Sequence, residues 1–142
     1  MTRTGGCLCG AVRYTVDGEL REILVCHCHE CRRWSGRAWA ATAARRAQLT
    51  IDGEEQIRWF PSPESDHAAD RGSCSRCGAT MFWSVPGWRQ ISIAAGTLDD
   101  SSALSVAAHI WTDQAAAWEW VPTDVPSYPR GYPDDGPRLA WT

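Results

Sequence analysis

Seven cysteines in three short-spaced groups constrain the fold of this chain more than any other feature of its sequence. The groups are Cys7-x-Cys9, Cys26-x-Cys28-x-x-Cys31 and Cys74-x-x-Cys77. An odd number of thiols cannot all pair as disulfides, whereas short spacings of this kind are typical of metal sites. Zinc has four protein ligands at a structural site and three at a catalytic site, where one position stays open for water or substrate. Because seven is four plus three, the cysteines predict two zinc ions, one structural and one catalytic.

The economical partition assigns the two outer groups to the structural zinc. The ligands of that closed site would be Cys7, Cys9, Cys74 and Cys77. A glycine follows each pair and suits the tight turns of such sites, and these glycines are Gly10 and Gly78. The middle group would then form the open catalytic site, with the ligands Cys26, Cys28 and Cys31.

Spacing alone leaves other interpretations open. Cys26 and Cys28 could join the first cysteine pair in place of the last pair. His27 or His29 could complete a second structural site of three cysteines and one histidine. The outer cysteines could also be small buried apolar side chains, since free cysteine is among the most buried residue types.

Length and charge narrow the possible functions. The 142 residues fit a single domain. The net charge of -3 disfavours a nucleic-acid partner, and the absence of lysine excludes Schiff-base chemistry and a phosphate-loop lysine. The sequence has no apolar run long enough to cross a membrane, and its start lacks the pattern of a signal peptide. We therefore expect a cytoplasmic protein without a membrane partner.

Alternating apolar residues and turn signals predict a mainly β fold with few short helices. The expected strands cover residues 11–16, 22–25, 48–51, 56–60, 80–85 and 89–94. Asp52-Gly53 and Pro86-Gly87 each lie between two of these strands and predict hairpins. Residues 32–36 are expected to form a short helical turn ended by Gly36, and residues 103–111 fit either a strand or a short helix.

Prolines set the predicted limits of the domain. Regular structure is prevented towards the end of the chain by Pro122, Pro126, Pro129, Pro133 and Pro137. We therefore predict a zinc-binding domain over residues 1–121 and a proline-rich tail over residues 122–142. The tail is expected to pack on the domain or to trail from it.

Five stretches carry a family pattern, in order along the chain, at residues 6–14, 26–36, 71–78, 96–100 and 109–111. These stretches resemble the glutathione-dependent formaldehyde-activating enzymes and their centromere protein V relatives. The resemblance implies antiparallel β-sheets of the β-tent type and the same zinc partition, with the outer cysteines structural and the middle three at the active site. It also implies a carbon-sulfur lyase that forms or cleaves an S-hydroxymethyl thiol, with glutathione and formaldehyde as substrates.

Our first hypothesis is therefore a zinc-dependent lyase that acts on a small-molecule thiol and an aldehyde at the middle cysteines. A thiol in the open zinc position would lose its proton and become the nucleophile. Arg32, Arg33 or Arg71 could offset the negative charge of the thiolates or hold a carboxylate of the thiol substrate. His109 is expected to be a hydrogen-bonded packing residue.

Two other functions compete with the lyase. A non-enzymatic zinc scaffold would bind a protein or nucleic-acid partner, although the acidic balance of the chain disfavours nucleic acid. A redox enzyme would need a reactive cysteine outside the zinc sites, and the partition above leaves no such cysteine.

Overall fold

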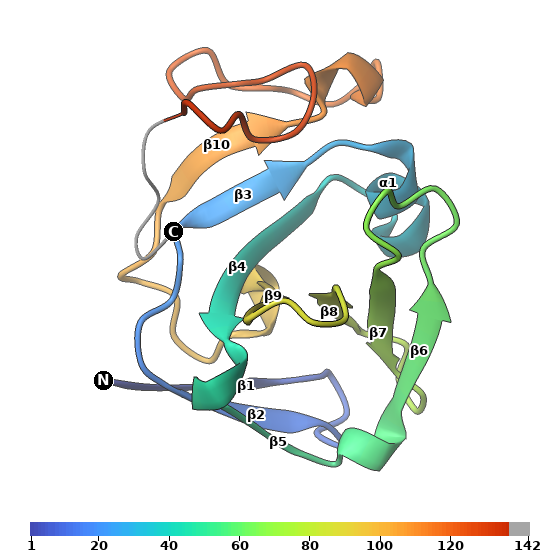
Figure 1. Ribbon diagram of the computed structural model, residues 1–142, viewed down its shortest axis with the longest axis vertical. Helices are drawn as coiled ribbons and strands as arrows, with labels where there is room; N and C mark the ends of the chain where they lie inside the picture. The colour runs from blue at the N-terminus through green and yellow to red at the C-terminus, as the bar shows by residue number, and fades with distance from the viewer. Residues whose placement is uncertain (137–142) are drawn as a thin grey trace.

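The structure is a computed structural model and describes residues 1–136. Two β-sheets form the framework of this part of the chain, one above the other in the view of Figure 1. The smaller sheet has the strand order β1-β2-β5, with the bounds β1 (Thr2–Gly6), β2 (Arg13–Asp17) and β5 (Leu49–Asp52). The larger sheet has the order β10-β3-β4-β9-β8-β7-β6. Its strands are β3 (Ile23–Cys26), β4 (Trp39–Arg45), β6 (Ile57–Pro61), β7 (Asp70–Cys74), β8 (Thr80–Ser84), β9 (Gln90–Ala94) and β10 (Val106–Ile110).

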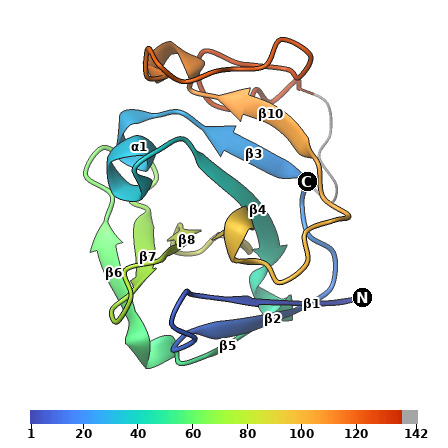
Figure 2. The ribbon, with the colours of Figure 1, turned by 180° about the vertical axis from the view of Figure 1, so that it is seen from behind.

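Short helical segments join these strands. The α-helix α1 (His29–Ser35) follows β3, and it lies beside the ends of β6 and β7 in the views of Figures 1 and 2. The 3-10 turns are η1 (Arg46–Gln48), η2 (Glu54–Gln56), η3 (Ala95–Thr97) and η4 (Thr112–Gln114). Among the described residues, no helix has the length and apolar character needed to cross a membrane. The cytoplasmic location stays a prediction.

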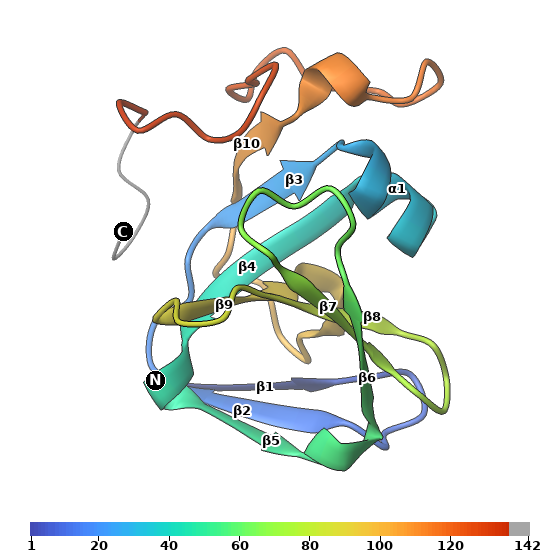
Figure 3. The same ribbon diagram turned by 45° about the vertical axis from the view of Figure 1, so that its right-hand side comes forward.

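The main core lies between the two sheets. Tyr14 and Val16 point inward from β2, because alternate residues of a strand face the same side. They belong to one buried cluster with Phe82 of β8 and Ile93 of β9. The ring of Tyr14 meets that of Phe82 edge-on, with the centroids 5.8 Å apart. This cluster fixes the small sheet against the large one. Figure 3 shows the backbones of the two sheets facing each other.

The predicted fold class is confirmed, since both sheets are mostly antiparallel and the helices are few and short. β3 and β10 form a parallel pair within the larger sheet. The expected hairpin at Pro86-Gly87 is also confirmed, because β8 pairs with β9. The helical turn ends as expected at Gly36, which has a φ of 84°.

The hairpin predicted at Asp52-Gly53 is wrong. β5 pairs with β2, and β6 pairs with β7 in the other sheet. Gly53 has a φ of 79°, and the turn η2 that follows it leads the chain from one sheet into the other. The dipeptide is therefore a turn, but it joins two sheets and not two paired strands.

The described part of the predicted tail packs on the larger sheet. The backbone N–H of His109 donates to Pro126 O at 2.9 Å, and the N–H of Tyr128 donates back to His109 O at 2.9 Å. Tyr128 and Tyr132 pack against the buried side chains of Leu24 and Ala108. Residues 137–142 of the predicted tail lie outside the described residues, and a domain limit at residue 121 remains a prediction.

Candidate metal centre and cavity

The four outer cysteines gather at one point although they come from distant parts of the chain. Their Sγ atoms all lie within 4.8 Å of one another. Within the first pair Cys9 Sγ lies 3.7 Å from Cys7 Sγ, and the two pairs meet where Cys9 Sγ lies 3.8 Å from Cys74 Sγ. Each pair sits on a tight turn in which Gly10 N–H donates to Cys7 O and Gly78 N–H donates to Cys74 O. Both glycines have a positive φ, 81° and 76°, as the sequence pattern predicted.

The three middle cysteines converge because of the way α1 begins. Cys26 is the last residue of β3, and Cys28 is the N-cap of α1. The Sγ of Cys28 accepts a hydrogen bond from the backbone N–H of Cys31 at 3.4 Å, which turns its side chain back over the first helical turn. The sulfur atoms of Cys26, Cys28 and Cys31 consequently lie within 4.8 Å of one another.

The nearby histidines do not join this sulfur group. His27 shares a hydrogen bond of 2.8 Å between its Nε2 and Nδ1 of His109. His29 donates from Nδ1 to Oε1 of Gln114 at 3.2 Å, and its Nε2 lies 2.8 Å from a carboxylate oxygen of Glu64. In the described part of the chain, the middle group therefore consists of three cysteine thiols without a histidine. His109 is buried and hydrogen-bonded, which confirms its expected packing role.

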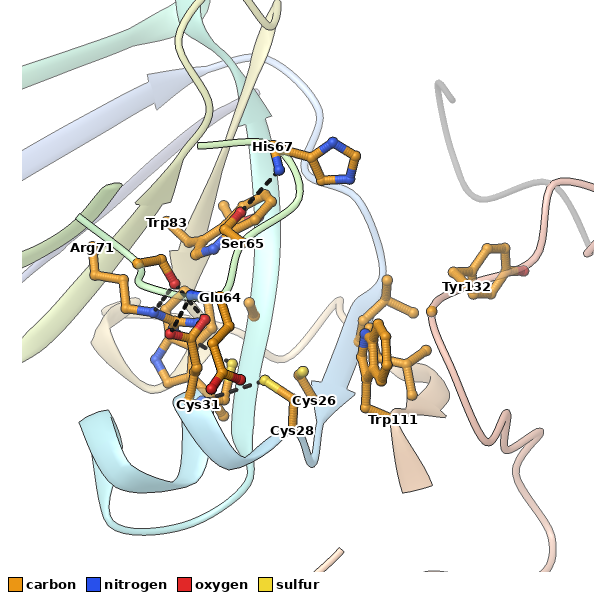
Figure 4. Close-up of a pocket in the computed structure, with 18 of the residues that line it drawn as sticks. Cys26, Cys28, Cys31, Glu64, Ser65, His67, Arg71, Trp83, Trp111 and Tyr132 are labelled. Atoms are coloured by element: carbon orange, nitrogen blue, oxygen red, sulfur yellow. Dashed lines mark hydrogen bonds and ion pairs between the residues drawn. The ribbon is translucent and has the colours of Figure 1, made fainter. Parts of the chain in front are cut away.

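A cavity of about 440 Å³ opens beside the middle cysteines. Figure 4 shows the sulfur atoms of Cys26 and Cys28 between Arg71 and Glu64 on one side and Trp111 on the other. Four tryptophans supply much of the remaining wall, and these are Trp39, Trp83, Trp88 and Trp111. The cavity thus combines an apolar aromatic wall with a few polar groups, which is the usual composition of a small-molecule site.

Arg71 is the charged side chain that reaches the middle cysteines. Its exposed fraction is 4%, and its Nη1 lies 3.5 Å from Cys31 Sγ. Its Nε donates to Ser62 Oγ at 3.0 Å, and Nη2 lies 3.9 Å from a carboxylate oxygen of Glu30. The guanidinium also stacks 5.1 Å from the ring centre of Trp34. These contacts fix a positive charge beside a group of thiols.

In each cysteine group the environment favours a thiolate at some sulfur atoms, whereas the pKa values of Cys9, Cys26 and Cys31 are raised. In the middle group, the thiols of Cys26 and Cys31 lower the pKa of Cys28. In the outer group, the backbone N–H of Ala79 lowers the pKa of Cys77 to about 6. Thiolate sulfur is the form that binds zinc, and groups of four and of three thiols match its closed and open coordination. Both cysteine groups could therefore hold a metal ion, and their chemistry is consistent with zinc.

Comparison with known proteins places the chain in a family. The family described as "Glutathione-dependent formaldehyde-activating enzyme" matches residues 2–114. The chain belongs to this family. A crystal structure of a Rhodobacter sphaeroides protein is similar, with 25% sequence identity, a TM-score of 0.56, and coverage of 70% of this chain and 90% of that one. Family membership supports a formaldehyde-activating function related to glutathione, with small molecules as substrates.

The cavity of this family member also contains polar residues that sequence reasoning did not identify. Glu30 and Ser62 hold Arg71, and Arg21 lines the cavity as a second buried arginine. Of the other two arginines considered from the sequence, Arg32 donates to His27 O at 3.3 Å and Arg33 is exposed. Arg21 is isolated from every motif in the chain, so no spacing signal pointed to it.

Proposed function

We propose that the chain is a zinc-dependent carbon-sulfur lyase that forms or cleaves the adduct of a thiol with formaldehyde. The observation that carries the proposal is the group of three convergent sulfur atoms on the wall of a cavity, without a histidine near enough to close it. In this proposal, Cys26, Cys28 and Cys31 hold a zinc ion at the active site. Cys7, Cys9, Cys74 and Cys77 hold a second, structural zinc ion.

Zinc bound by three thiolates would supply an open position at which a substrate thiol loses its proton. In the synthetic direction, the sulfur of the thiol forms a bond to the carbonyl carbon of formaldehyde, and the carbonyl oxygen takes up a proton. Cleavage is the reverse, with the electron pair of the carbon-sulfur bond returning to sulfur. Formaldehyde and glutathione are the substrates that the family suggests.

The protein's own residues would adjust the charge and polarity of the site. Three thiolates on one divalent ion carry a net negative charge, and Arg71 places a buried guanidinium 3.5 Å from Cys31 Sγ to offset it. Glu30 and Ser62 hold that guanidinium in position. The tryptophans make part of the wall apolar, which strengthens the electrostatic effect of Arg71 on a bound thiolate.

The test measures the exchange between formaldehyde, glutathione and their adduct by NMR exchange spectroscopy, with and without the protein. Zinc content is determined in the same samples. We expect two zinc ions per chain and an exchange rate above the spontaneous one. Two zinc ions without any acceleration of thiol-formaldehyde exchange would overturn the lyase proposal and favour the scaffold.

Two serine substitutions test the division between the sites. Cys28→Ser should abolish the acceleration and leave the circular dichroism spectrum unchanged. Cys74→Ser should lower the midpoint of thermal unfolding strongly, because loss of a structural zinc ligand couples directly to folding. Equal loss of folded protein in both variants would contradict this division.

A further inference from the structure

Arg21 is a buried cation in the wall of the cavity. It precedes β3, its exposed fraction is 7%, and it contributes to the same lining as Cys26. Its Nη2 donates to Ala41 O at 3.0 Å and its Nε donates to Glu22 O at 3.1 Å. In residues 1–136, Nη1 of Arg21 makes no hydrogen bond and no ion pair reaches the guanidinium.

Burying a charge without an ion pair costs free energy, and the lowered pKa of Arg21 reflects this cost. Burial lowers the pKa of Arg21 to about 10, with the charge of Glu22 acting in the opposite direction. Carbonyl oxygens solvate the guanidinium only in part, whereas a carboxylate would satisfy both its charge and its free donors. The cavity wall therefore contains a position at which an anionic group of a ligand gains a partner.

Arg71, the other buried arginine of the cavity, is already bound to groups of the protein and is not available for a ligand carboxylate. The donors of Arg71 are directed to Ser62, to the carboxylate of Glu30 and to Cys31 Sγ. Arg71 therefore serves the cysteine group, and Arg21 is the buried arginine of the lining that makes no ion pair within residues 1–136.

Strand register gives the separation between Arg21 and the cysteines. Cys26 pairs with Trp39 on β4, and Leu24 pairs with Ala41, the residue whose carbonyl accepts from Arg21. These two residue pairs lie two positions apart along the strands, which corresponds to about 7 Å at ~3.3 Å per residue. A cysteinyl peptide with a carboxylate on the following residue spans a similar separation between its sulfur and that carboxylate.

We propose that Arg21 binds the glycine carboxylate of glutathione, the thiol that the proposed function already assigns to this site. This inference rests on the proposed function, because it places the substrate sulfur at the middle cysteines.

The test measures binding without turnover. S-methylglutathione and its glycine monoethyl ester are titrated into the zinc-loaded full chain by calorimetry. They differ in one carboxylate, and neither has a free thiol to react. We expect the acid to bind about tenfold more tightly than the ester, because a buried arginine forms strong charge-assisted hydrogen bonds with a carboxylate. Arg21→Gln and Arg21→Met should both reduce this ratio to about one.

Arg58→Gln is the matched control, because Arg58 is exposed on β6 and does not line the cavity. It should keep the tenfold ratio. A wild-type protein that binds acid and ester equally, or that binds neither, overturns the proposal, as does an Arg21 variant that keeps the preference. If both Arg21 variants fail to fold, a crystal structure of the wild-type complex decides the matter. The glycine carboxylate must then lie within hydrogen-bond distance of Arg21.

The result is independent of the lyase assay. A protein that distinguishes acid from ester but does not accelerate exchange would keep Arg21 as the carboxylate site and remove the lyase. A protein that accelerates exchange but binds acid and ester equally would keep the lyase and remove this role of Arg21.

Discussion

Replacing Tyr14 by Phe should make the protein less stable than the wild type in mild alkali and more stable than the wild type in strong alkali. The Tyr14 side chain is 2% exposed, and burial raises its pKa from 10.0 to about 12 although the hydrogen bond with Thr97 acts against this. A raised pKa means that the folded protein holds the phenol proton more tightly than the unfolded chain does. Its contribution to stability is therefore complete below pH 10 and is lost as the pH rises through about 12.

The size of each change in stability follows from the two pKa values of Tyr14, which are 10.0 for the unfolded chain and about 12 for the folded protein. At pH 9 both states are protonated, and Tyr14→Phe loses only the 2.8 Å hydrogen bond to Thr97 Oγ1, which costs about 1 kcal/mol. At pH 11.5 the unfolded tyrosine is mostly ionised and the folded one is not, which destabilises the wild type by about 2 kcal/mol through this group. Tyr14→Phe lacks this penalty, so it should be less stable at pH 9 and more stable at pH 11.5.

Urea unfolding followed by circular dichroism at the two pH values measures the difference directly. Other groups that titrate in alkali affect both proteins equally and cancel in the comparison. A difference in free energy of unfolding that stays constant between pH 9 and pH 11.5 would refute the reasoning, because it would show that Tyr14 ionises equally in both states.

Two further substitutions test the site and the fold. Arg71→Met should slow adduct exchange at least tenfold and leave zinc content unchanged, because it removes the charge beside Cys31 but no ligand; unchanged exchange in a zinc-loaded sample would count against this role. Gly53→Ala should lower the free energy of unfolding by at least about 1 kcal/mol in a urea titration, since a Cβ there would overlap Ala11 O and φ is positive; an unchanged midpoint would contradict the close approach.

The cysteine groups could be predicted from the sequence because their geometry is local. Gly10 and Gly78 mark the turns that place each outer pair, and the spacing of Cys28 and Cys31 fits one helical turn beginning at an N-cap. The choice between partitions could not be made from spacing, since it depends on which distant turns the two sheets bring together. The structure brings the outer pairs together and leaves the middle group with the cavity.

Three strands were missed for reasons that differ. β1 consists mostly of small and polar residues, and β4, with the sequence WAATAAR, is rich in alanine, which favours helices in isolation. β4 is nevertheless a strand because β3 and β9 pair with it on both sides. β7 contains Arg71 and Gly72, which interrupt any apolar alternation. Tertiary pairing decides the structure of all three, and a local pattern does not contain it.

Loop lengths give a physical reason for expecting different consequences from metal loss at the two cysteine groups. Cys9 and Cys74 are separated by 65 positions, and a cross-link that closes a loop of this length is worth roughly 4 kcal/mol in the chain-entropy treatment of disulfides. The middle group closes only a short turn, for which the same treatment gives about 2 kcal/mol. A metal at the outer group would therefore restrict the unfolded chain far more than one at the middle group. Under the proposed partition, the middle site can exchange ligands and admit a substrate at little cost to the fold.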